Sequence, residues 1–254
     1  LHVKQATEAY HIGEAAPVKS YLNQEKILEV ILLSGADAVH PGYGFLSEND
    51  DFARLCEKNK INFIGPSADS MDLCGDKMKC KAAMLKAKVP TVPGSPGLVK
   101  DADDAEKIAN KIGYPVMLKS VYGGGGRGIR IVTNDTELRD GYESVTGESM
   151  ASVGKSAIIV EKFLEKTRHI EFQMARDTHG NTVHIFEREC SIQRRNQKLI
   201  EQTPSPAVDE ETRTRIGKLV CKAADAVGYT NLGTAEFLRA DDGEFYFIEI
   251  NARL

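Results

Sequence analysis

A run of four glycines separates two apolar stretches in the middle of the chain. The segment YGGGGRG covers residues 122–128, between PVMLKSV at 115–121 and GIRIV at 128–132. Because glycine loses more conformational freedom on folding than any other residue, such a run is costly unless its backbone contacts something. Both flanking stretches read as strands, so the glycines join strand to strand. A hairpin flap of this kind can offer backbone N–H groups to the oxygens of a triphosphate.

Two common glycine motifs do not fit this region. Gly123, Gly125 and Gly128 match G-x-G-x-x-G, but that fingerprint requires a helix on the third glycine, and a β-branched run follows here. The residues 154–156 resemble the end of a P-loop, whose pattern requires glycine where this chain has Ser149. We therefore expect a plain loop at 154–156 and a flap at the glycine run. An exposed glycine hairpin without function is the alternative.

Lysines near the glycine run are the first candidates for anion binding. Lys119 lies in PVMLKSV, where every neighbour is apolar or small, and a buried lysine is costly unless it meets an anion. Lys77 begins an expected helix in GDKMKCKAAM and is a weaker candidate. Its neighbours Lys79 and Lys81 read as ordinary surface charge.

A second basic segment, RECSIQRRNQKLIE, covers residues 188–201. It lies between an expected strand and the loop TPSPAV. A solvated basic turn is the ordinary interpretation. The functional interpretation is a positively charged surface, including Arg188 and Lys198, that binds a carboxylate, phosphate or bicarbonate.

Two carboxylates stand out near the end of the chain. Glu236 in TAEFLRA and Glu249 in FIEIN lie on two expected strands joined by a tight turn, so they can sit side by side. Asn251 follows two residues after Glu249 and shares its face of the strand. Adjacent carboxylates repel unless they are protonated or bridged by a cation, and this oxygen set suits Mg²⁺ held jointly with phosphates. An outward polar face of a sheet is the alternative.

The composition limits the class of protein. The 254 residues carry a net charge of −4, and no apolar run approaches the ~18 residues of a membrane span. No basic tract is interleaved with aromatics, and the five cysteines form no C-x-x-C pair. We expect reduced thiols, a small-molecule partner, neither membrane nor nucleic acid, and a cytoplasmic location, or the mitochondrial matrix in a eukaryote. The ends LHVKQATEAY and FIEINARL read as trimmed.

Helical and strand patterns alternate along the chain. Expected helices cover 25–33, 49–60, 67–73, 76–87, 101–112, 134–144 and 211–229. Expected strands cover 36–40, 61–65, 115–121, 128–132, 157–163, 169–177, 182–189, 233–240 and 244–251. The prolines and glycines of VPTVPGSPG mark a subdomain boundary. This order indicates a mixed α/β and α+β protein.

Six segments together resemble one known family. HPGYGFLSEN, GDK with VPTVPGS, GGGGRG, EKFLEKTRHIE, ERECSIQRRNQK and FIEINAR are similar, in order and spacing, to the biotin carboxylase component of biotin-dependent carboxylases. The resemblance covers about 38–253. It implies an ATP-grasp fold with a partial Rossmann-like N-terminal domain at 1–75 and an ATP-grasp domain at 76–254. A lid subdomain is implied at about 92–163.

The resemblance implies a nucleotide site for ATP. Lys77 and Lys119 would bind the phosphates, with Gly125 and Gly126 closing over them. The adenine would lie against 161–164 and Leu238. The implied contacts of this site are Lys77, Lys119, Gly125, Gly126, Glu161, Lys162, Phe163, Leu164, His169 at the ribose, Gln193, Asn196 and Leu238. Many family members carry histidine at the position of Asn196.

The resemblance also implies the metal and substrate sites. Glu236, Glu249 and Asn251 would hold Mg²⁺ or Mn²⁺. Lys198 and Arg253 would act on bicarbonate as the catalytic pair. Tyr43 and Gly44 would approach biotin, the carried substrate.

The implied reaction is the ATP-dependent carboxylation of carrier-bound biotin by bicarbonate through carboxyphosphate. The implied partners are a biotin carboxyl carrier, a carboxyltransferase and a second copy in a homodimer. Family members continue after N-A-R with a glutamate that acts on bicarbonate and an arginine that meets biotin, so we expect this segment to bind nucleotide without carboxylating biotin alone. Another ATP-grasp ligase, such as a carbamoyl-phosphate synthase half, and a non-catalytic nucleotide-binding module are the alternatives.

Overall fold

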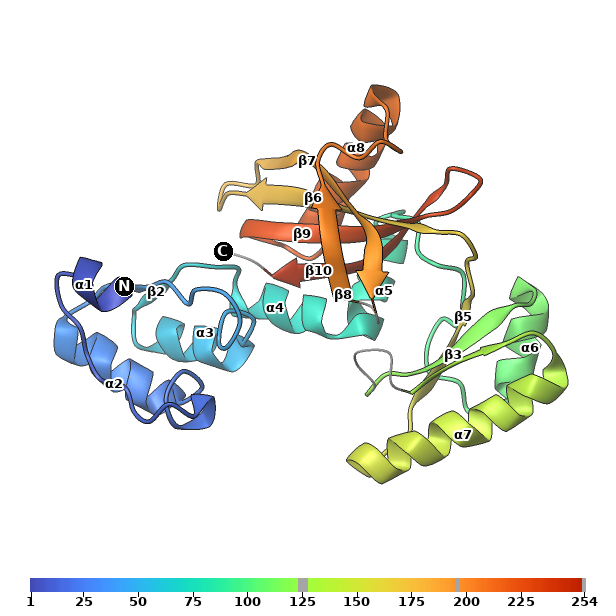
Figure 1. Ribbon diagram of the computed structural model, residues 1–254, viewed down its shortest axis with the longest axis horizontal. Helices are drawn as coiled ribbons and strands as arrows, with labels where there is room; N and C mark the ends of the chain where they lie inside the picture. The colour runs from blue at the N-terminus through green and yellow to red at the C-terminus, as the bar shows by residue number, and fades with distance from the viewer. Residues whose placement is uncertain (123–127, 195–196, 253–254) are drawn as a thin grey trace.

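The structure is a computed structural model that describes residues 1–122, 128–194 and 197–252. Three units follow one another in space: an N-terminal unit, a central five-stranded sheet, and a smaller sheet covered by two helices (Figure 1). The helices α4 (Ala68–Gly75) and α5 (Lys77–Lys86) run beneath the central sheet, with α4 leading from the N-terminal unit. The mixture of helices with parallel and antiparallel strands confirms the predicted α/β and α+β class.

The N-terminal unit contains one short parallel strand pair. Its elements are α1 (His2–Gln5), a 3-10 helix (Pro17–Lys19), α2 (Gln24–Ser34), β1 (Ala38–Val39), α3 (Asp50–Lys58) and β2 (Asn62–Phe63). The strands β1 and β2 pair in parallel, with α3 as the crossover between them. The Asn49 side chain accepts from the backbone N–H of Phe52 and so caps α3. Both strands are shorter than the expected 36–40 and 61–65.

The smaller sheet lies within the range expected for the lid subdomain, about 92–163, and its role as a lid stays a prediction. It has the order β4 (Ile129–Val132), β3 (Val116–Ser120), β5 (Ile158–Lys162), and both pairings are antiparallel. The helices α6 (Ala102–Ile112) and α7 (Asp135–Val153) pack on it, and their apolar side chains form one core with those of the strands. The helix α7 is longer than the expected 134–144. It ends at Gly154 in the left-handed conformation, which makes 154–156 a helix end and the loop that was predicted.

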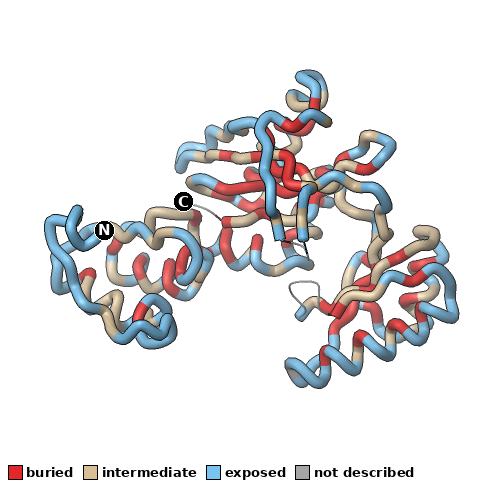
Figure 2. The backbone as a smooth tube through the Cα atoms, viewed as in Figure 1, coloured by how far each residue is buried: buried red, intermediate tan, exposed pale blue. Residues whose placement is uncertain are grey.

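The central sheet is antiparallel throughout. Its order is β10 (Phe245–Ala252), β9 (Asn231–Arg239), β6 (Arg168–Arg176), β7 (Thr182–Arg194), β8 (Gln197–Gln202). Side chains alternate between its faces, so Ile170, Phe172 and Met174 join the core with α8 (Glu210–Ala226), while His169, Glu171 and Gln173 point to the opposite face. Figure 2 shows the buried residues gathered along these strands. One face of the sheet therefore packs against α8, and the other carries polar and charged side chains.

The described residues of the basic segment, 188–194 and 197–201, form strands rather than a turn. They form the end of β7 and the start of β8, an antiparallel pair in which Gln193 is the partner of Lys198. The expected strand at 182–189 therefore stopped too early. The alternation typical of a strand is hard to recognise in this segment, because charged residues occupy the side of the strand that does not face apolar neighbours.

A buried ion pair attaches α8 to the central sheet. Glu187 on β7 has a fully buried side chain, and the guanidinium of Arg213 donates to both of its carboxylate oxygens at 2.7 Å. The backbone N–H of Ser205 donates to the same carboxylate. Burial alone would raise the pKa of Glu187, but the hydrogen bonds from Arg213 outweigh it and lower this pKa.

We expect Glu187→Gln to lower the free energy of unfolding by about 3 kcal/mol at pH 7, because it leaves the Arg213 guanidinium without its charged partner. The folded-state pKa lies below the unfolded one, so the stabilisation is present above about pH 4.3 and disappears as the pH falls through the folded value. Urea unfolding between pH 7 and pH 3.5 measures the difference. The exposed Glu165→Gln is the control. An equal difference at both ends of this pH range would contradict the assignment.

Candidate active site

Charged side chains form one row across the central sheet. The strand register aligns Arg188 on β7 with Glu171 on β6, Glu171 with Glu236 on β9, and Glu236 with Glu249 on β10. The prediction that Glu236 and Glu249 lie side by side is confirmed by this register. Neighbouring strands in a sheet bring directly opposed side chains to about 5 Å, so the row places three carboxylates in one line.

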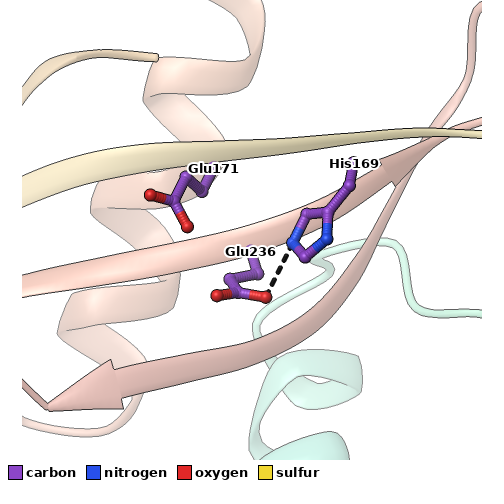
Figure 3. Close-up of side chains that lie close together, drawn as sticks. All are labelled: His169, Glu171 and Glu236. Atoms are coloured by element: carbon purple, nitrogen blue, oxygen red, sulfur yellow. Dashed lines mark ion pairs between the residues drawn. The ribbon is translucent and has the colours of Figure 1, made fainter. Parts of the chain in front are cut away.

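Cations separate the carboxylates of this row. The Lys198 ammonium on β8 donates to Glu171 Oε2 at 2.5 Å and to Glu236 Oε1 at 2.8 Å. Arg188 Nε donates to Glu171 Oε1 at 2.6 Å. His169 Nε2 lies 2.7 Å from Glu236 Oε2, as Figure 3 shows, and Gln193 Nε2 lies 2.8 Å from the other ring nitrogen of His169. Glu171 therefore has two positive partners, and Glu236 has one positive partner, Lys198, and a basic one, His169.

The pKa values follow from these contacts. Burial by itself would raise the pKa of Glu236, but hydrogen bonds from His169 and Lys198 outweigh it and lower that pKa to about 2. Burial works to lower the pKa of Lys198, but its hydrogen bonds to Glu171 and Glu236 raise it above the ordinary value. Both groups are charged at neutral pH, so Lys198 presents a fixed positive charge at the polar face.

The oxygen donors of this face suit a hard divalent cation. Asn251 Nδ2 donates to Glu236 Oε1 at 2.7 Å, which brings the amide to the same carboxylate that neighbours Glu249. Carboxylate and amide oxygens are ligands that Mg²⁺ accepts. His169, Glu171 and Glu236 also offer ligand atoms within 4.8 Å of one another (Figure 3). The metal set Glu236, Glu249 and Asn251 stays a prediction.

A cavity of about 110 Å³ lies next to the row, between the central sheet and the lid. Lys77 and Lys119, the two predicted phosphate ligands, both line it. Glu249 and Leu238 line it from the central sheet, and Glu161 lines it from β5. The structure therefore brings predicted phosphate, metal and adenine contacts to one space.

Segment 90–95, inside the expected boundary VPTVPGSPG, connects the walls of this cavity. The backbone N–H of Phe247 on β10 donates to the carbonyl of Pro90, and the N–H of Lys162 on β5 donates to the carbonyl of Pro93. Gly94 forms an isolated antiparallel bridge with Glu161. The boundary segment thus tethers the lid strand to the edge of the central sheet.

The anion that Lys119 meets in the structure is a carboxylate. Lys119 Nζ donates to Glu161 Oε2 at 2.6 Å, and Lys81 Nζ donates to Glu161 Oε1 at 2.8 Å. The expectation that Lys81 is ordinary surface charge is wrong, because its side chain is 15% exposed and lines the cavity. The i, i+4 spacing from Lys77 places both on one face of α5.

A second cavity of about 220 Å³ opens on the polar face at the opposite end of the row. Tyr43, predicted to approach biotin, lines it together with Gln173, Arg188 and Thr234. Gly44 follows Tyr43 with a φ of +75°, a conformation that favours glycine. The loop PGYGF therefore reaches the central sheet from the N-terminal unit.

The remaining residues predicted for the nucleotide site either do not line the cavity or lie outside the described residues. The Lys162 ammonium donates to the carbonyls of Gly113 and Tyr114, so its side chain serves the lid rather than the cavity. Phe163 and Leu164 are half-buried just beyond β5. Four predicted residues lie outside the described residues: Gly125, Gly126, Asn196 and Arg253.

Two site residues were missed from the sequence. Glu171 lies two residues after His169 on the same strand face, and that spacing was the available signal. Lys81 lies one helical turn after Lys77. Neither partner, Lys198 for Glu171 or Glu161 for Lys81, is near in sequence, so the pairs were not visible there.

Known families and proteins match this chain along its length. A family model described as "Carbamoyl-phosphate synthase L chain, ATP binding domain" matches residues 76–254, and one described as "Biotin carboxylase, N-terminal domain" matches residues 1–71. The chain belongs to the biotin carboxylase family. The 2-oxoglutarate carboxylase small subunit of Hydrogenobacter thermophilus is 51% identical over 253 residues, 100% of this chain and 53% of its own length. The biotin carboxylase of a Nostoc species is 50% identical, with 100% and 57% covered.

Solved biotin carboxylase structures share the fold. A complex of biotin carboxylase with "beta-gamma-ATP" from Campylobacter jejuni has a TM-score of 0.91 at 48% identity, covering 100% of this chain and 57% of that chain. A biotin carboxylase domain dimer of the Hydrogenobacter enzyme, with MgADP, ADP and bicarbonate, has a TM-score of 0.88 at 51% identity, covering 100% and 56%. The chain spans about half the length of the curated relatives it matches. Within the described ranges, no helix is both long and apolar enough to cross a bilayer.

We expect Gly94→Ala to lower the free energy of unfolding by about 1–3 kcal/mol through overpacking. A Cβ at Gly94 would lie 2.4 Å from the Val160 carbonyl oxygen and 3.1 Å from Glu161 Cα, and neither backbone atom can move freely. Gly97→Ala is the matched control, because a Cβ there meets nothing within 4 Å. Urea unfolding of both variants gives the comparison. Equal stabilities would show that the bridge between Gly94 and Glu161 is not close-packed.

Proposed function

We propose that this chain supplies the ATP and bicarbonate sites of a biotin carboxylase, which carboxylates carrier-bound biotin at the expense of ATP. The observation that supports this most is the adjacency of the lysine-lined cavity and the row of carboxylates and cations on one sheet face. A phosphoryl donor in the cavity would lie next to the fixed charge of Lys198. Relatives with the same fold carry the names biotin carboxylase and 2-oxoglutarate carboxylase.

The chain's residues would position the nucleotide. Lys77 and Lys119 approach the cavity from α5 and β3, where their ammonium groups would neutralise phosphate oxygens. Leu238 and the segment 161–164 supply apolar and backbone surface for the adenine. Phosphoryl transfer needs positioning and charge stabilisation more than covalent participation by the protein, and this lining provides both.

The carboxylates would hold the metal. Glu236, Glu249 and Asn251 present oxygens beside the cavity, and Mg²⁺ bound there would neutralise charge on the phosphates and orient them. His169 lies against Glu236 and keeps that carboxylate ionised and oriented. A cation site therefore needs no rearrangement of the strands.

Lys198 would bind and orient bicarbonate together with Arg253. Its ammonium lies between two carboxylates at the polar face, so an anion placed there meets a charge that is already fixed. In the proposed reaction, a bicarbonate oxygen attacks the γ-phosphorus of ATP, and ADP leaves. The resulting carboxyphosphate yields CO₂ and phosphate, and the ureido nitrogen of biotin, deprotonated by that phosphate or a nearby carboxylate, attacks CO₂.

The proposal extends to partners and acceptors. Tyr43 and Gly44, beside the second cavity, would face the biotin of a carboxyl carrier, and a carboxyltransferase would receive the carboxyl group. We propose a homodimer as the assembly, in line with the dimer of the Hydrogenobacter domain. A cytoplasmic location, or the mitochondrial matrix in a eukaryote, belongs to the same proposal.

A carbamoyl-phosphate synthase half is the second candidate, because the family model over residues 76–254 carries that description. The match of residues 1–71 to a biotin carboxylase domain favours the first candidate. The full-length protein that carries this sequence distinguishes them by its acceptor: bicarbonate-dependent ADP formation stimulated by biotin supports carboxylation, and stimulation by ammonia supports the alternative.

We expect Glu249→Gln to abolish the Mg²⁺-dependent gain in ATP affinity, because one of two facing carboxylates is lost. Calorimetric titration of ATP with and without Mg²⁺ measures this gain. Glu244→Gln, at an exposed residue directly before β10, is the control and keeps the gain. ATP binding by the unmodified protein that is indifferent to Mg²⁺ would instead indicate a non-catalytic nucleotide-binding module.

A further inference from the structure

Three lysines of the nucleotide cavity are not equivalent in their surroundings. Lys77 is exposed at the start of α5, and the Lys119 side chain is 33% exposed at the cavity wall. The Lys81 side chain is only 15% exposed, although it reaches the same cavity. Lys79, on the other side of the helix, is 53% exposed and pairs with Asp72. Lys81 is therefore the lysine of α5 whose charge is placed inside.

Lys81 shares one carboxylate with Lys119. Glu161 has a 13% exposed side chain, with one oxygen bonded to each ammonium group. Burial would raise the pKa of Glu161, but the charges of Lys119 and Lys81 outweigh it and lower that pKa. The carboxylate is thus ionised and held from two sides.

The charge balance of the cavity depends on Lys81. Its described lining contains three ammonium groups, from Lys77, Lys81 and Lys119, against two carboxylates, from Glu161 and Glu249. Without Lys81 the described lining would carry two ammonium groups and two carboxylates. Of the two ammonium groups that bond to Glu161, that of Lys119 would remain. Moving Lys119 to an incoming anion would then leave a buried carboxylate without compensation, which is unfavourable.

We propose that Lys81 is a positioning residue: it holds and compensates Glu161, so that Lys119 can exchange this carboxylate for the polyphosphate of a nucleotide. Lys81 acts through Glu161 and does not itself contact the phosphates. The more exposed Lys119 is the partner that moves, and the less exposed Lys81 is the one that stays. The inference rests on the proposed nucleotide role of the cavity.

The first test measures ADP binding to the purified protein by calorimetry. We expect Lys81→Met to weaken ADP binding about tenfold or more, the size of one charged hydrogen bond, and Lys79→Met to leave it unchanged. Lys81→Arg retains the cation and restores most of the affinity. Adenosine, which lacks phosphates, should bind Lys81→Met as it binds the unmodified protein, as measured by saturation-transfer NMR.

The second test is a double-mutant cycle with Glu161→Gln. If Lys81 acts through Glu161, adding Lys81→Met to Glu161→Gln costs much less ADP affinity than Lys81→Met alone. The double variant also removes both charges of the pair, so it keeps the test valid if Lys81→Met fails to fold. If Lys81→Met does not fold, Lys81→Arg is compared with the unmodified protein, and the double variant is compared with Glu161→Gln.

The outcomes separate this inference from the proposed function. Failure of the unmodified protein to bind ADP overturns the proposed function. If it binds ADP, three results overturn the role of Lys81: unchanged affinity in Lys81→Met, an equal loss in both backgrounds of the cycle, or an equal loss for adenosine. A loss of ADP affinity in Lys81→Arg as large as that in Lys81→Met also overturns it, because the arginine keeps the positive charge.

Discussion

The alternation of side chains along five antiparallel strands is the constraint on which the rest of the molecule depends. One face of the central sheet carries Phe172, Phe237 and Ile250 into the core with α8, and the other carries the row from Arg188 to Glu249. A shift of one residue in the pairing of β6 with β9 would move Glu171 towards the core and Phe172 towards the polar face. The strand register therefore holds both the core side chains and the row of charged side chains in place.

Carboxylates that each contact two basic side chains recur next to the cavity lined by Lys77 and Lys119. Glu161 lies between Lys81 and Lys119, Glu171 between Arg188 and Lys198, and Glu236 contacts both Lys198 and His169. At Glu161, two ammonium groups face one carboxylate, so positive charge remains available there. In the proposed function, a phosphate oxygen would take the place of the carboxylate at Lys119, and phosphoryl transfer depends on such charge stabilisation.

The cavity exists because three separate parts of the chain meet. The helix α5 brings Lys77 and Lys81, the lid strands bring Lys119 and Glu161, and the edge strand β10 brings Glu249. The segment 90–95 bonds to the lid and the central sheet through its backbone, with Gly94 in close contact with β5. A boundary segment identified by its prolines and glycines is therefore also a structural tie across the site.

The sequence by itself determined the order of elements and the pairing of Glu236 with Glu249, because period-two and helical patterns and tight turns are local properties. It marked Lys77, Lys119 and Lys198 as candidates, and their roles stay predictions. Only the tertiary structure decided that Lys81 is an internal residue and that Glu171 joins the row. It also showed that residues 188–194 and 197–201 belong to two paired strands. These features depend on partners that are distant along the chain, such as Glu161 for Lys81, and a charged residue looks the same in sequence whether water or a buried carboxylate faces it.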